Sequence, residues 1–341
     1  MTAYVLRRIC LFPVVAFGVT ILIFTLLQAL PPAARAMLFI QNPEQATAIA
    51  AIIRKYDLDK PMYVQYGHWL RQVVHGDLGY SQSARMPVAQ AIATFFPATL
   101  ELTGYAFGLI ILVGITLGTA AAVHRDGVVD HVSRIFSICG YSLPVFVWGL
   151  LLLLVFYGNL QWFPPERLSL AAGLYVQSRA FHAYTGLVTV DAVLNGSWWV
   201  LWDAARHLVL PVVTLTYFLA ATLVRITRSA VLDSLSQEYI RTARGKGLAE
   251  SAVIARHARR NALIPVITLS SSILIGLLGG VVITETIFNY PGIGRWGATA
   301  ALELDVPAVA GFALLVAGVT VLVNLAADVL YGYVDPRVRL R

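Results

Sequence analysis

Six long apolar stretches restrict what this chain can fold into. Each has 17 to 29 residues almost free of Asp, Glu, Lys and Arg, and a helix needs roughly 20 apolar residues to cross the hydrocarbon core of a bilayer. A helix also satisfies its own backbone hydrogen bonds in lipid. The expected membrane-spanning helices are approximately Ile9–Leu30, Leu102–Val123, Ile135–Phe163, Leu208–Val224, Ala262–Thr284 and Pro307–Ala327.

The composition agrees with an all-α membrane protein. Of the 341 residues, 58% are hydrophobic and 13% are charged, whereas a soluble domain has about 25% charged residues. Strands of a membrane barrel alternate in polarity over about ten residues, and these stretches do not alternate. The first stretch follows Arg7 and Arg8 and has 22 apolar residues, against 7 to about 15 in a secretory signal. We therefore expect an uncleaved anchor.

The basic residues are unevenly divided between the loops. If the N-terminus is cytoplasmic, the inner segments hold 15 of the 25 Lys and Arg residues in 67 residues, and the outer segments hold 10 in 137. Cytoplasmic loops carry such an excess. We therefore expect both termini in the cytoplasm, with inner segments 1–8, 124–134, 225–261 and 331–341.

This orientation also accounts for the net charge of +7 without nucleic acid as a partner. The basic residues border the membrane, where they favour lipid headgroups, and they form no aromatic-lined groove. Cys10 and Cys139 are the only cysteines and both fall in apolar stretches. We expect no disulfide framework.

The first outer loop, residues 31–101, is too long for a structureless connector. Helical patterns are expected in Ala46–Tyr56 and Tyr63–Val74, and HGDLGYS, which begins at His75, is expected to form a turn. Two interpretations stay open. The loop is an external gate or docking surface for a delivery protein, or it is an amphipathic helix at the headgroup level.

The other two outer loops carry aromatic and turn-forming residues. Trp198, Trp199 and Trp202 in the loop 164–207 are typical of an interfacial aromatic belt. The segment FNYPGIGRWG, which begins at Phe288, predicts a turn before the last span because it contains three glycines and a proline.

The inner loop 225–261 is the most informative segment. It has eight basic and three acidic residues, and its two helical stretches are interrupted at Gly245 to Gly247, since glycine is a poor helix former. Such a break presents a short surface helix that a partner protein can bind. The alternative is a basic loop that only enforces topology.

A series of motifs runs in order along the chain and resembles a known family. The motifs are YVLRR at Tyr4, YDLDKPMYVQYGHWL at Tyr56, GDLGYS at Gly76, PATLELT at Pro97, SLPVF at Ser142, RTARGKGLAESAVIARHARRN at Arg241, ETIFNYPGIGR at Glu285 and DPRVR at Asp335. They are similar to the B-type permease subunit of binding-protein-dependent ABC importers, in the branch for oligopeptides, dipeptides and nickel. Arg241, Thr242 and Ala243 stand where the general coupling-loop pattern has Glu-Ala-Ala, as is common in the peptide branch.

The resemblance implies a type I ABC importer permease fold with six transmembrane helices. The implied division is an N-terminal span 1–30, an extracytoplasmic region 31–101, a five-helix core 96–331 containing the coupling loop 225–261, and a cytoplasmic tail 332–341. It also implies a homologous C-type permease, two ABC ATPase subunits or domains, and an extracytoplasmic binding protein as partners. No cofactor is expected on this chain, and ATP and Mg belong to the ATPases. The implied cargo is a peptide, with nickel chelates, oligosaccharides or opines as alternatives.

In the family, a short helix of the inner loop docks in a groove of the ATPase. The residues that this implies here are Arg241, Thr242, Ala243, Arg244, Lys246, Gly247, Leu248, Glu250 and His257. Gly247 would permit the sharp turn, and Leu248 and Ala243 would fill the groove. Arg244, Lys246 and Glu250 would fix the register.

Polar residues inside or beside the spans are candidates for the transport pathway, because burying polar groups in a membrane is costly. The candidates are Ser142, Pro144, Tyr217, Ser270 and Glu285. For the serines, helix packing is an equally simple explanation. Arg225, Arg228 and Asp328 lie at span ends and are expected to reach water there.

The sequence offers little for other classes of protein. It contains no phosphate-binding loop of the type Gly-x-x-x-x-Gly-Lys-Ser/Thr, no His-Glu-x-x-His or Cys-x-x-Cys metal motif and no Gly-x-Ser-x-Gly element. We expect neither an enzyme nor a metal site. An ion-driven secondary transporter using Glu285 is the main alternative, and it predicts inverted repeats, which are not evident. An intramembrane hydrolase is the remote one.

Overall fold

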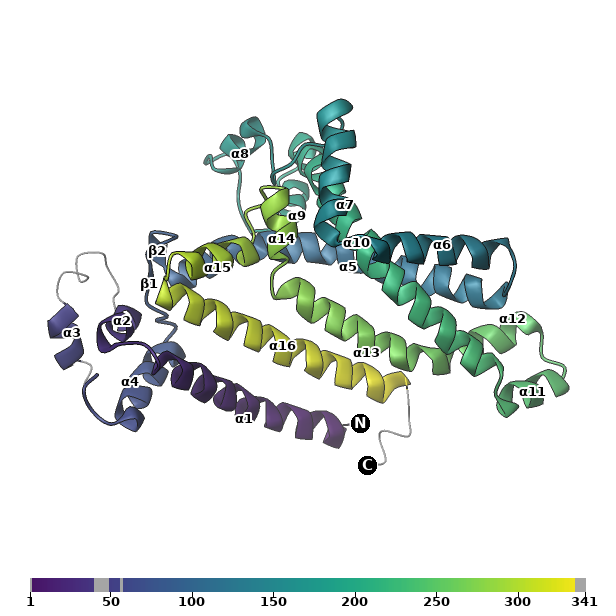
Figure 1. The fold of residues 1–341 in the computed structure, drawn as a ribbon, viewed down its shortest axis with the longest axis horizontal. Coiled ribbons are helices and arrows are strands. Elements are labelled where there is room, and N and C mark those ends of the chain that lie inside the picture. The colour runs from purple at the N-terminus through teal and green to yellow at the C-terminus, as the bar shows by residue number, and fades with distance from the viewer. Residues whose placement is uncertain (1, 40–48, 56–57, 335–341) are drawn as a thin grey trace.

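The computed structural model describes residues 2–39, 49–55 and 58–334. Within these residues the chain is a bundle of long helices with short elements at its ends (Figure 1). The long helices are α1 (Thr2–Leu27), α5 (Val88–Val123), α10 (Trp198–Leu235), α13 (Arg259–Leu278) and α16 (Val306–Val334). Helix α10 packs between α5 and α13, α16 covers α13, and α1 lies along α16.

The expectation of an all-α membrane protein is confirmed. Among the described residues, four helices are long and apolar enough to cross a membrane, and a bent pair makes five if it counts as one span. The part of α1 with described side chains, Pro13–Leu27, is apolar but shorter. Six spans and the orientation in the membrane stay predictions.

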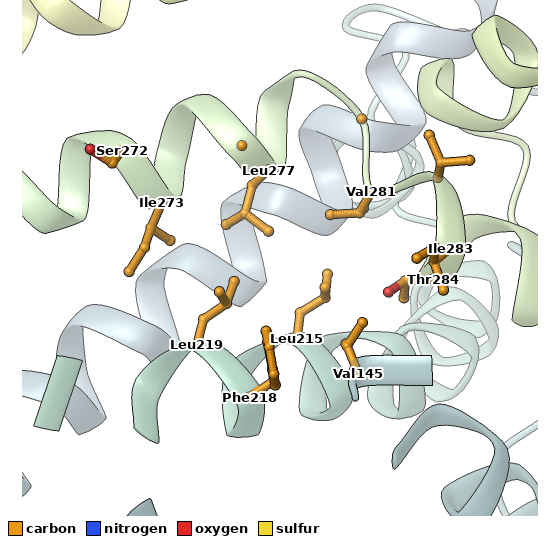
Figure 2. A pocket seen from close by; sticks show the side chains of 13 residues that line it. Val145, Leu215, Phe218, Leu219, Ser272, Ile273, Leu277, Val281, Ile283 and Thr284 are labelled. Atoms are coloured by element: carbon orange, nitrogen blue, oxygen red, sulfur yellow. The ribbon is translucent and has the colours of Figure 1, made fainter. Parts of the chain in front are cut away.

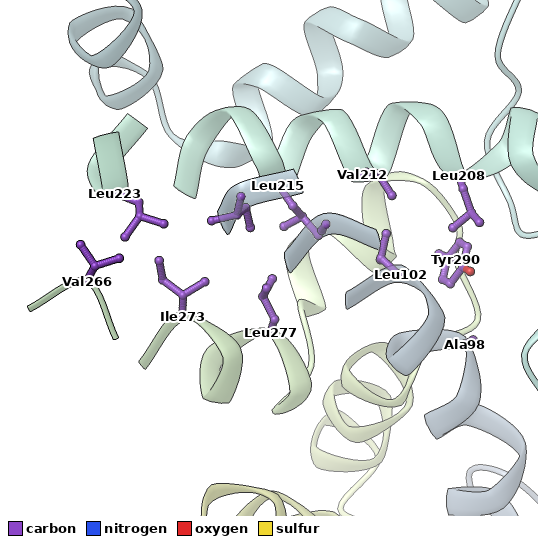
Figure 3. Packing of buried hydrophobic residues seen from close by; sticks show 12 residues of the cluster. Ala98, Leu102, Leu208, Val212, Leu215, Leu223, Val266, Ile273, Leu277 and Tyr290 are labelled. Carbon is purple, nitrogen blue, oxygen red and sulfur yellow. The ribbon is translucent and has the colours of Figure 1, made fainter. Parts of the chain in front are cut away.

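The bundle core lies where α5, α10 and α13 meet. Leu102 of α5, Leu215 and Leu223 of α10 and Leu277 of α13 are all at most 3% exposed, and side chains of the three helices point into one layer (Figure 3). Van der Waals packing of this kind drives helix association where lipid is as apolar as the side chains.

A glycine brings α5 and α10 into close contact. A Cβ added at Gly118 would stand 2.8 Å from the carbonyl oxygen of Val224, which is closer than real Cβ atoms approach. Small residues at such crossings let two backbones approach in membranes. Gly118 therefore fixes how near α10 lies to α5.

The expected third span, Ile135–Phe163, is sharply bent in the structure. The chain forms α6 (Val128–Ser142), then α7 (Val145–Leu152) with a π-helical continuation, η3 (Leu153–Asn159), and the two parts are bent by 98°. The break falls at Pro144, which has no N–H to donate, and Leu143 before it is extended, as residues preceding proline tend to be.

The first outer loop is folded, as expected. Its elements are α2 (Pro32–Ala36), the 3₁₀ turn η1 (Met37–Phe39), α3 (Ile49–Lys55), α4 (Met62–Val74), and the hairpin strands β1 (Tyr80–Ser81) and β2 (Met86–Pro87). Helix α4 and the turn after it confirm two sequence predictions. The predicted helix Ala46–Tyr56 agrees with α3, although residues 46–48 and 56 lie outside the described residues.

This region has a core of its own against α1 and α16. Phe24 of α1 and Trp69 of α4 are each 4% exposed, and their rings lie 5.6 Å apart. Tyr66 packs edge-on against Phe24 and shares a hydrogen bond of 2.8 Å with Thr20. The apolar side of α4 is thus packed against the helix bundle.

The remaining short elements flank the long helices (Figure 1). They are α8 (Leu170–Val176), α9 (Val188–Leu194), α14 (Val282–Ile287) and α15 (Ile293–Leu302) on one side, and α11 (Glu238–Gly245), α12 (Glu250–Ala252) and the π-helix η4 (Val253–Ala258) on the other. Helices α8 and α9 stand beside α7 above the middle of the bundle (Figure 1). We call the end with α11 and α12 the loop end, and the end with the β1–β2 hairpin and α15 the hairpin end. Helix α1 begins, and α16 ends, toward the loop end.

Candidate functional site

The predicted coupling loop protrudes from the loop end between α10 and α13 (Figure 1). Helix α11 runs outward, the chain turns at residues 246–249, and α12 and η4 return into α13. The predicted break at Gly245 to Gly247 is confirmed, because α11 ends at Gly245.

A small apolar cluster holds the two arms of this loop together. Ile240, Val253 and Ala258 are fully buried and Ala243 is 5% exposed, and all four belong to one cluster. Beside it, the Ser234 hydroxyl donates a hydrogen bond of 3.0 Å to the carbonyl oxygen of Ala258. The structure therefore corrects the prediction that Ala243 fills a partner's groove, because its side chain is enclosed by the loop itself.

Gly247 makes the turn at the tip. Its φ of +75° lies in the left-handed region, and a Cβ there would meet nothing within 4 Å. Backbone conformation, and not space, requires glycine at this position. The next residue, Leu248, is 42% exposed on the tip. An apolar side chain offered to solvent on a rigid turn suits insertion into a partner.

Two charged residues clamp the tip from both sides. The Arg244 guanidinium donates hydrogen bonds of 3.0 Å and 2.6 Å to the two carboxylate oxygens of Glu250, and this carboxylate raises the pKa of Arg244. Both side chains are about half exposed. Both residues were predicted to fix the register of the loop on its partner. In the structure they pair with each other inside the loop.

The other predicted coupling residues are spread along the loop. Arg241 pairs with Glu238 at 2.8 Å on the exposed face of α11, and the Thr242 hydroxyl donates to the Glu238 carbonyl oxygen. Lys246 is exposed at the tip, and His257 is half-buried in η4. A π-helical turn is rare and often marks a functional position.

The structure separates the predicted pathway residues. Ser142 is exposed at the end of α6, and Pro144 is exposed at the bend. Tyr217 packs edge-on against Phe136 and Trp148, at 4.9 Å and 4.7 Å. Ser270 is buried and donates to the Val266 carbonyl oxygen of its own helix, as serines in membrane helices often do.

Glu285 does not line a cavity, which corrects that part of its prediction. It is fully buried. The Thr99 hydroxyl donates to its Oε1 at 2.6 Å, and the Arg295 amide donates to its Oε2 at 2.7 Å. Desolvation raises the pKa of Glu285, while these hydrogen bonds oppose the rise. A gating role stays a prediction.

This carboxylate explains the glycines of ETIFNYPGIGR. It lies at the N-terminus of α15, where free backbone N–H groups and the helix dipole favour an anion. A Cβ at Gly292 would overlap the Glu285 carboxyl group. Gly294 is confined as well, because a Cβ added at Gly294 would lie 2.8 Å from the Cα of Gly280. The motif is therefore a helix cap that needs both glycines.

A cavity of about 520 Å³ opens beside this cap (Figure 2). Its walls come from α7, α10, α13 and α14, and they are largely apolar. Phe218 and Leu219 of α10 face Ile273 and Leu277 of α13 across it. Sequence reasoning missed these residues, because apolar side chains that line a cavity look like those that face lipid.

Two further buried carboxylates tie the hairpin end together. Glu101 of α5 accepts hydrogen bonds from Arg167 at 2.7 Å and from the Thr189 amide at 2.6 Å, which fastens the loop before α9 to the bundle. Asp305 accepts from the Ser81 hydroxyl at 2.7 Å and the Ser83 amide at 2.9 Å, which fastens the hairpin to the start of α16.

A buried ion pair joins α6 to α10 near the loop end. Arg228 contacts Asp130, which is fully buried, at 2.5 Å, and Arg134 contacts the same carboxylate at 2.7 Å. Arg228 was expected to reach water; its side chain is 22% exposed, and its guanidinium also pairs with Asp130. The sequence showed a charged residue beside an apolar stretch. It did not show that the partner of this residue lies 98 residues away. No group of three or more potential metal ligands occurs in the part of the chain that the structure describes.

Comparison with known proteins places this architecture in a family. Residues 114–340 match the family "Binding-protein-dependent transport system inner membrane component", and residues 1–103 match the N-terminal model of the same membrane component. The chain belongs to this family. It is a multi-pass inner-membrane permease component of an ABC transport system, and it is not an enzyme, since ATP hydrolysis resides on other subunits.

Several relatives are similar over nearly the whole length. The di/tripeptide transport system permease protein DppB of Pseudomonas aeruginosa is 38% identical over 340 residues, 99% of both chains. The probable D,D-dipeptide transport system permease protein DdpB of Escherichia coli is 41% identical, over 98% of this chain and 97% of its own. The oligopeptide transport system permease protein AppB of Bacillus subtilis is 34% identical over 99% of both.

Proposed function

We propose that this chain is one of two permease subunits of an ABC importer for peptides. Full-length similarity to peptide permeases supports the cargo. The main structural observation in its support is the coupling loop. Leu248 is exposed on the glycine turn at its tip, and the two arms of the loop pack against each other. The cargo alternatives are nickel chelates and oligosaccharides.

In this proposal the chain has six spans, with α1 as the first and the α6–α7 pair as the third. Both termini and the coupling loop face the cytoplasm, in agreement with the excess of Lys and Arg in those segments. The partners are a homologous C-type permease, two ATPase subunits that bind ATP and Mg, and an extracytoplasmic binding protein that docks at the hairpin end.

The loop transmits movement by rigid contact. Leu248 enters a groove of the ATPase, and the apolar cluster that includes Ile240 and Val253 keeps α11 and η4 in one arrangement as the ATPases close. Arg228 and Asp130 then pass the movement of α10 to α6, because a buried, doubly bonded ion pair resists separation. The predicted pathway lies between this chain and the second permease.

A co-purification experiment tests the proposal. Tagged wild-type chain is expected to recover a second permease and ATPase subunits, with hydrolysis stimulated by binding protein carrying dipeptide. Gly247→Asp is expected to abolish recovery of the ATPases. Gly196→Asp is the matched control, because Gly196 also has positive φ and open space but lies before α10, away from the loop end. Recovery of the chain alone, with ATP-independent transport in liposomes, would overturn the proposal.

A further inference from the structure

A second cavity lies between α6 and α10. It has a volume of about 210 Å³ and is lined by Ser137, Ile138, Tyr141, Ser142, Ala221, Thr222 and Arg225. It is distinct from the apolar cavity beside α14, with which it shares no residue. It includes Ser142, one of the predicted pathway residues.

Arg225 is the only charged residue in the lining of this cavity. Its guanidinium lies over the ring of Tyr141, at 5.6 Å from the ring centre, and within the described part of the chain no carboxylate pairs with it. Three residues later in α10, Arg228 has a buried carboxylate partner. Arg225 and Arg228 therefore differ in whether a carboxylate already neutralises their charge, and this decides which of them can bind a further anion.

The Arg225 side chain extends toward Tyr141 of α6. Tyr141 in turn stacks on Phe218, two turns earlier in α10. Arg225 itself is exposed in this chain. A charge beside an apolar span that has no carboxylate partner needs water, another polar group or a ligand.

The other polar groups of the cavity suit an anion too. The hydroxyls of Ser137 and Thr222 have no hydrogen-bond partner among the described residues, and a guanidinium presents five N–H donors. The hydroxyls can donate or accept, so together with the guanidinium they give the cavity several free donors. Such a set binds a carboxylate strongly, since hydrogen bonds between charged groups are shorter and stronger than neutral ones.

We propose that this Arg225 cavity is a subsite of the translocation path that binds the C-terminal carboxylate of the peptide in transit. The inference rests on the proposed function and goes beyond it, because it assigns a recognition step to the permease itself. Tyr141, which is 63% exposed, would offer its ring to the terminal side chain of the peptide.

The test compares a peptide acid with its amide in the complete importer, reconstituted in liposomes. Uptake of L-alanyl-L-alanine and of its C-terminal amide is measured for wild type, Arg225→Gln and Arg225→Lys. The acid-to-amide ratio is expected to fall about tenfold in Arg225→Gln, since a charged hydrogen bond is lost, and to change less in Arg225→Lys. The binding protein selects between the acid and the amide in the same way for every permease variant, so its selection does not affect the comparison of the ratios.

Two controls keep the outcomes distinct. Arg179→Gln changes an exposed arginine outside the cavity and is expected to leave the ratio unchanged. Binding-protein-stimulated ATP hydrolysis by Arg225→Gln is expected to persist, which shows that the complex is folded. If wild type imports dipeptide and Arg225→Gln keeps the wild-type ratio, the subsite is overturned while the proposed function stands. If wild type imports no peptide, both fail.

A labelling experiment tests the cavity directly. In the complex with Cys10 and Cys139 replaced by Ser, Ser137→Cys is expected to react with a water-soluble anionic methanethiosulfonate, and dipeptide with its binding protein and ATP is expected to slow the reaction. Val132→Cys, 55% exposed on the same helix but outside the cavity, is the control that peptide does not protect. Loss of bound phosphatidylglycerol in Arg225→Gln, without a change in the acid-to-amide ratio, would identify a lipid site and refute the proposal.

Discussion

At the hairpin end, Glu101, Glu285 and Asp305 are at most 4% exposed, whereas at the loop end Glu238 and Glu250 have side chains that are 81% and 55% exposed. The buried carboxylates each accept hydrogen bonds from a distant part of the chain. The exposed ones pair within three to six residues of themselves.

The difference indicates two kinds of mechanical element. Buried, multiply bonded charges are costly to separate, so we expect the hairpin end to move as one body. Exposed ion pairs contribute little, and an isolated short helix is marginal. The coupling loop therefore relies on its small apolar cluster and, in the proposed complex, on its partner.

The largest effect is expected from Glu285→Gln. Glutamine has one carbonyl oxygen and one NH2 group, so one of the two donors, from Thr99 or Arg295, would face another donor in place of an acceptor. A buried donor left unsatisfied costs about 1–3 kcal/mol. Unfolding in detergent should begin at clearly lower denaturant concentration. Glu303→Gln, an exposed change on the same side of the molecule, is the control. Equal midpoints for both variants would show that the buried carboxylate does not hold this end.

The next variant, Ile240→Ala, is expected to act within the coupling loop and to change the unfolding midpoint of the whole molecule less than Glu285→Gln does. Ile240 is fully buried in the loop cluster, and truncation of a buried isoleucine costs about 2 kcal/mol or more. Hydrogen exchange should accelerate across residues 238–258 and stay unchanged in α5. Leu248→Ala, in the same loop but at an exposed position, should change exchange little. Acceleration throughout the bundle would contradict an independent loop.

Gly247→Ala is expected to cost about 1 kcal/mol, because a residue with a Cβ is strained at positive φ. Gly247→Asn should cost less, since asparagine tolerates this conformation. Gly245→Ala is the matched control: it lies in α11, it has open space around it, and alanine favours a helix. Hydrogen exchange at residues 246–249 measures all three. Equal effects of the two alanine changes would remove backbone conformation as the cause.

The smallest effect is expected from Arg244→Gln. The Arg244–Glu250 pair is exposed and screened by salt, so the unfolding midpoint should match wild type at low and high salt. Arg167→Gln is the contrasting variant at the hairpin end, where Glu101 is buried; it should lower the midpoint in both conditions. If Arg244→Gln lowered the unfolding midpoint strongly and Arg167→Gln did not, the conclusion that charges matter more at the hairpin end than at the loop end would be wrong.

Much of this organisation was predictable from local sequence. Helix α4, the folded first outer loop and the break at Gly245 were expected, because hydrophobic periodicity, proline and glycine act over a few residues. The sites were less predictable. Ala243 was expected to face a partner and lies inside the loop, and Glu285 was expected beside a pathway and caps α15.

The sequence by itself determined that this is a helical membrane protein, the order of its apolar stretches, and where its coupling loop breaks, since these depend on composition and short-range backbone preference. The tertiary structure alone decided the 98° bend between α6 and α7, the partners of each buried carboxylate, and which arginine of α10 stays unpaired. The physical reason is distance along the chain. Thr99 meets Glu285 across 186 residues and Arg228 meets Asp130 across 98, and no local pattern records such a contact.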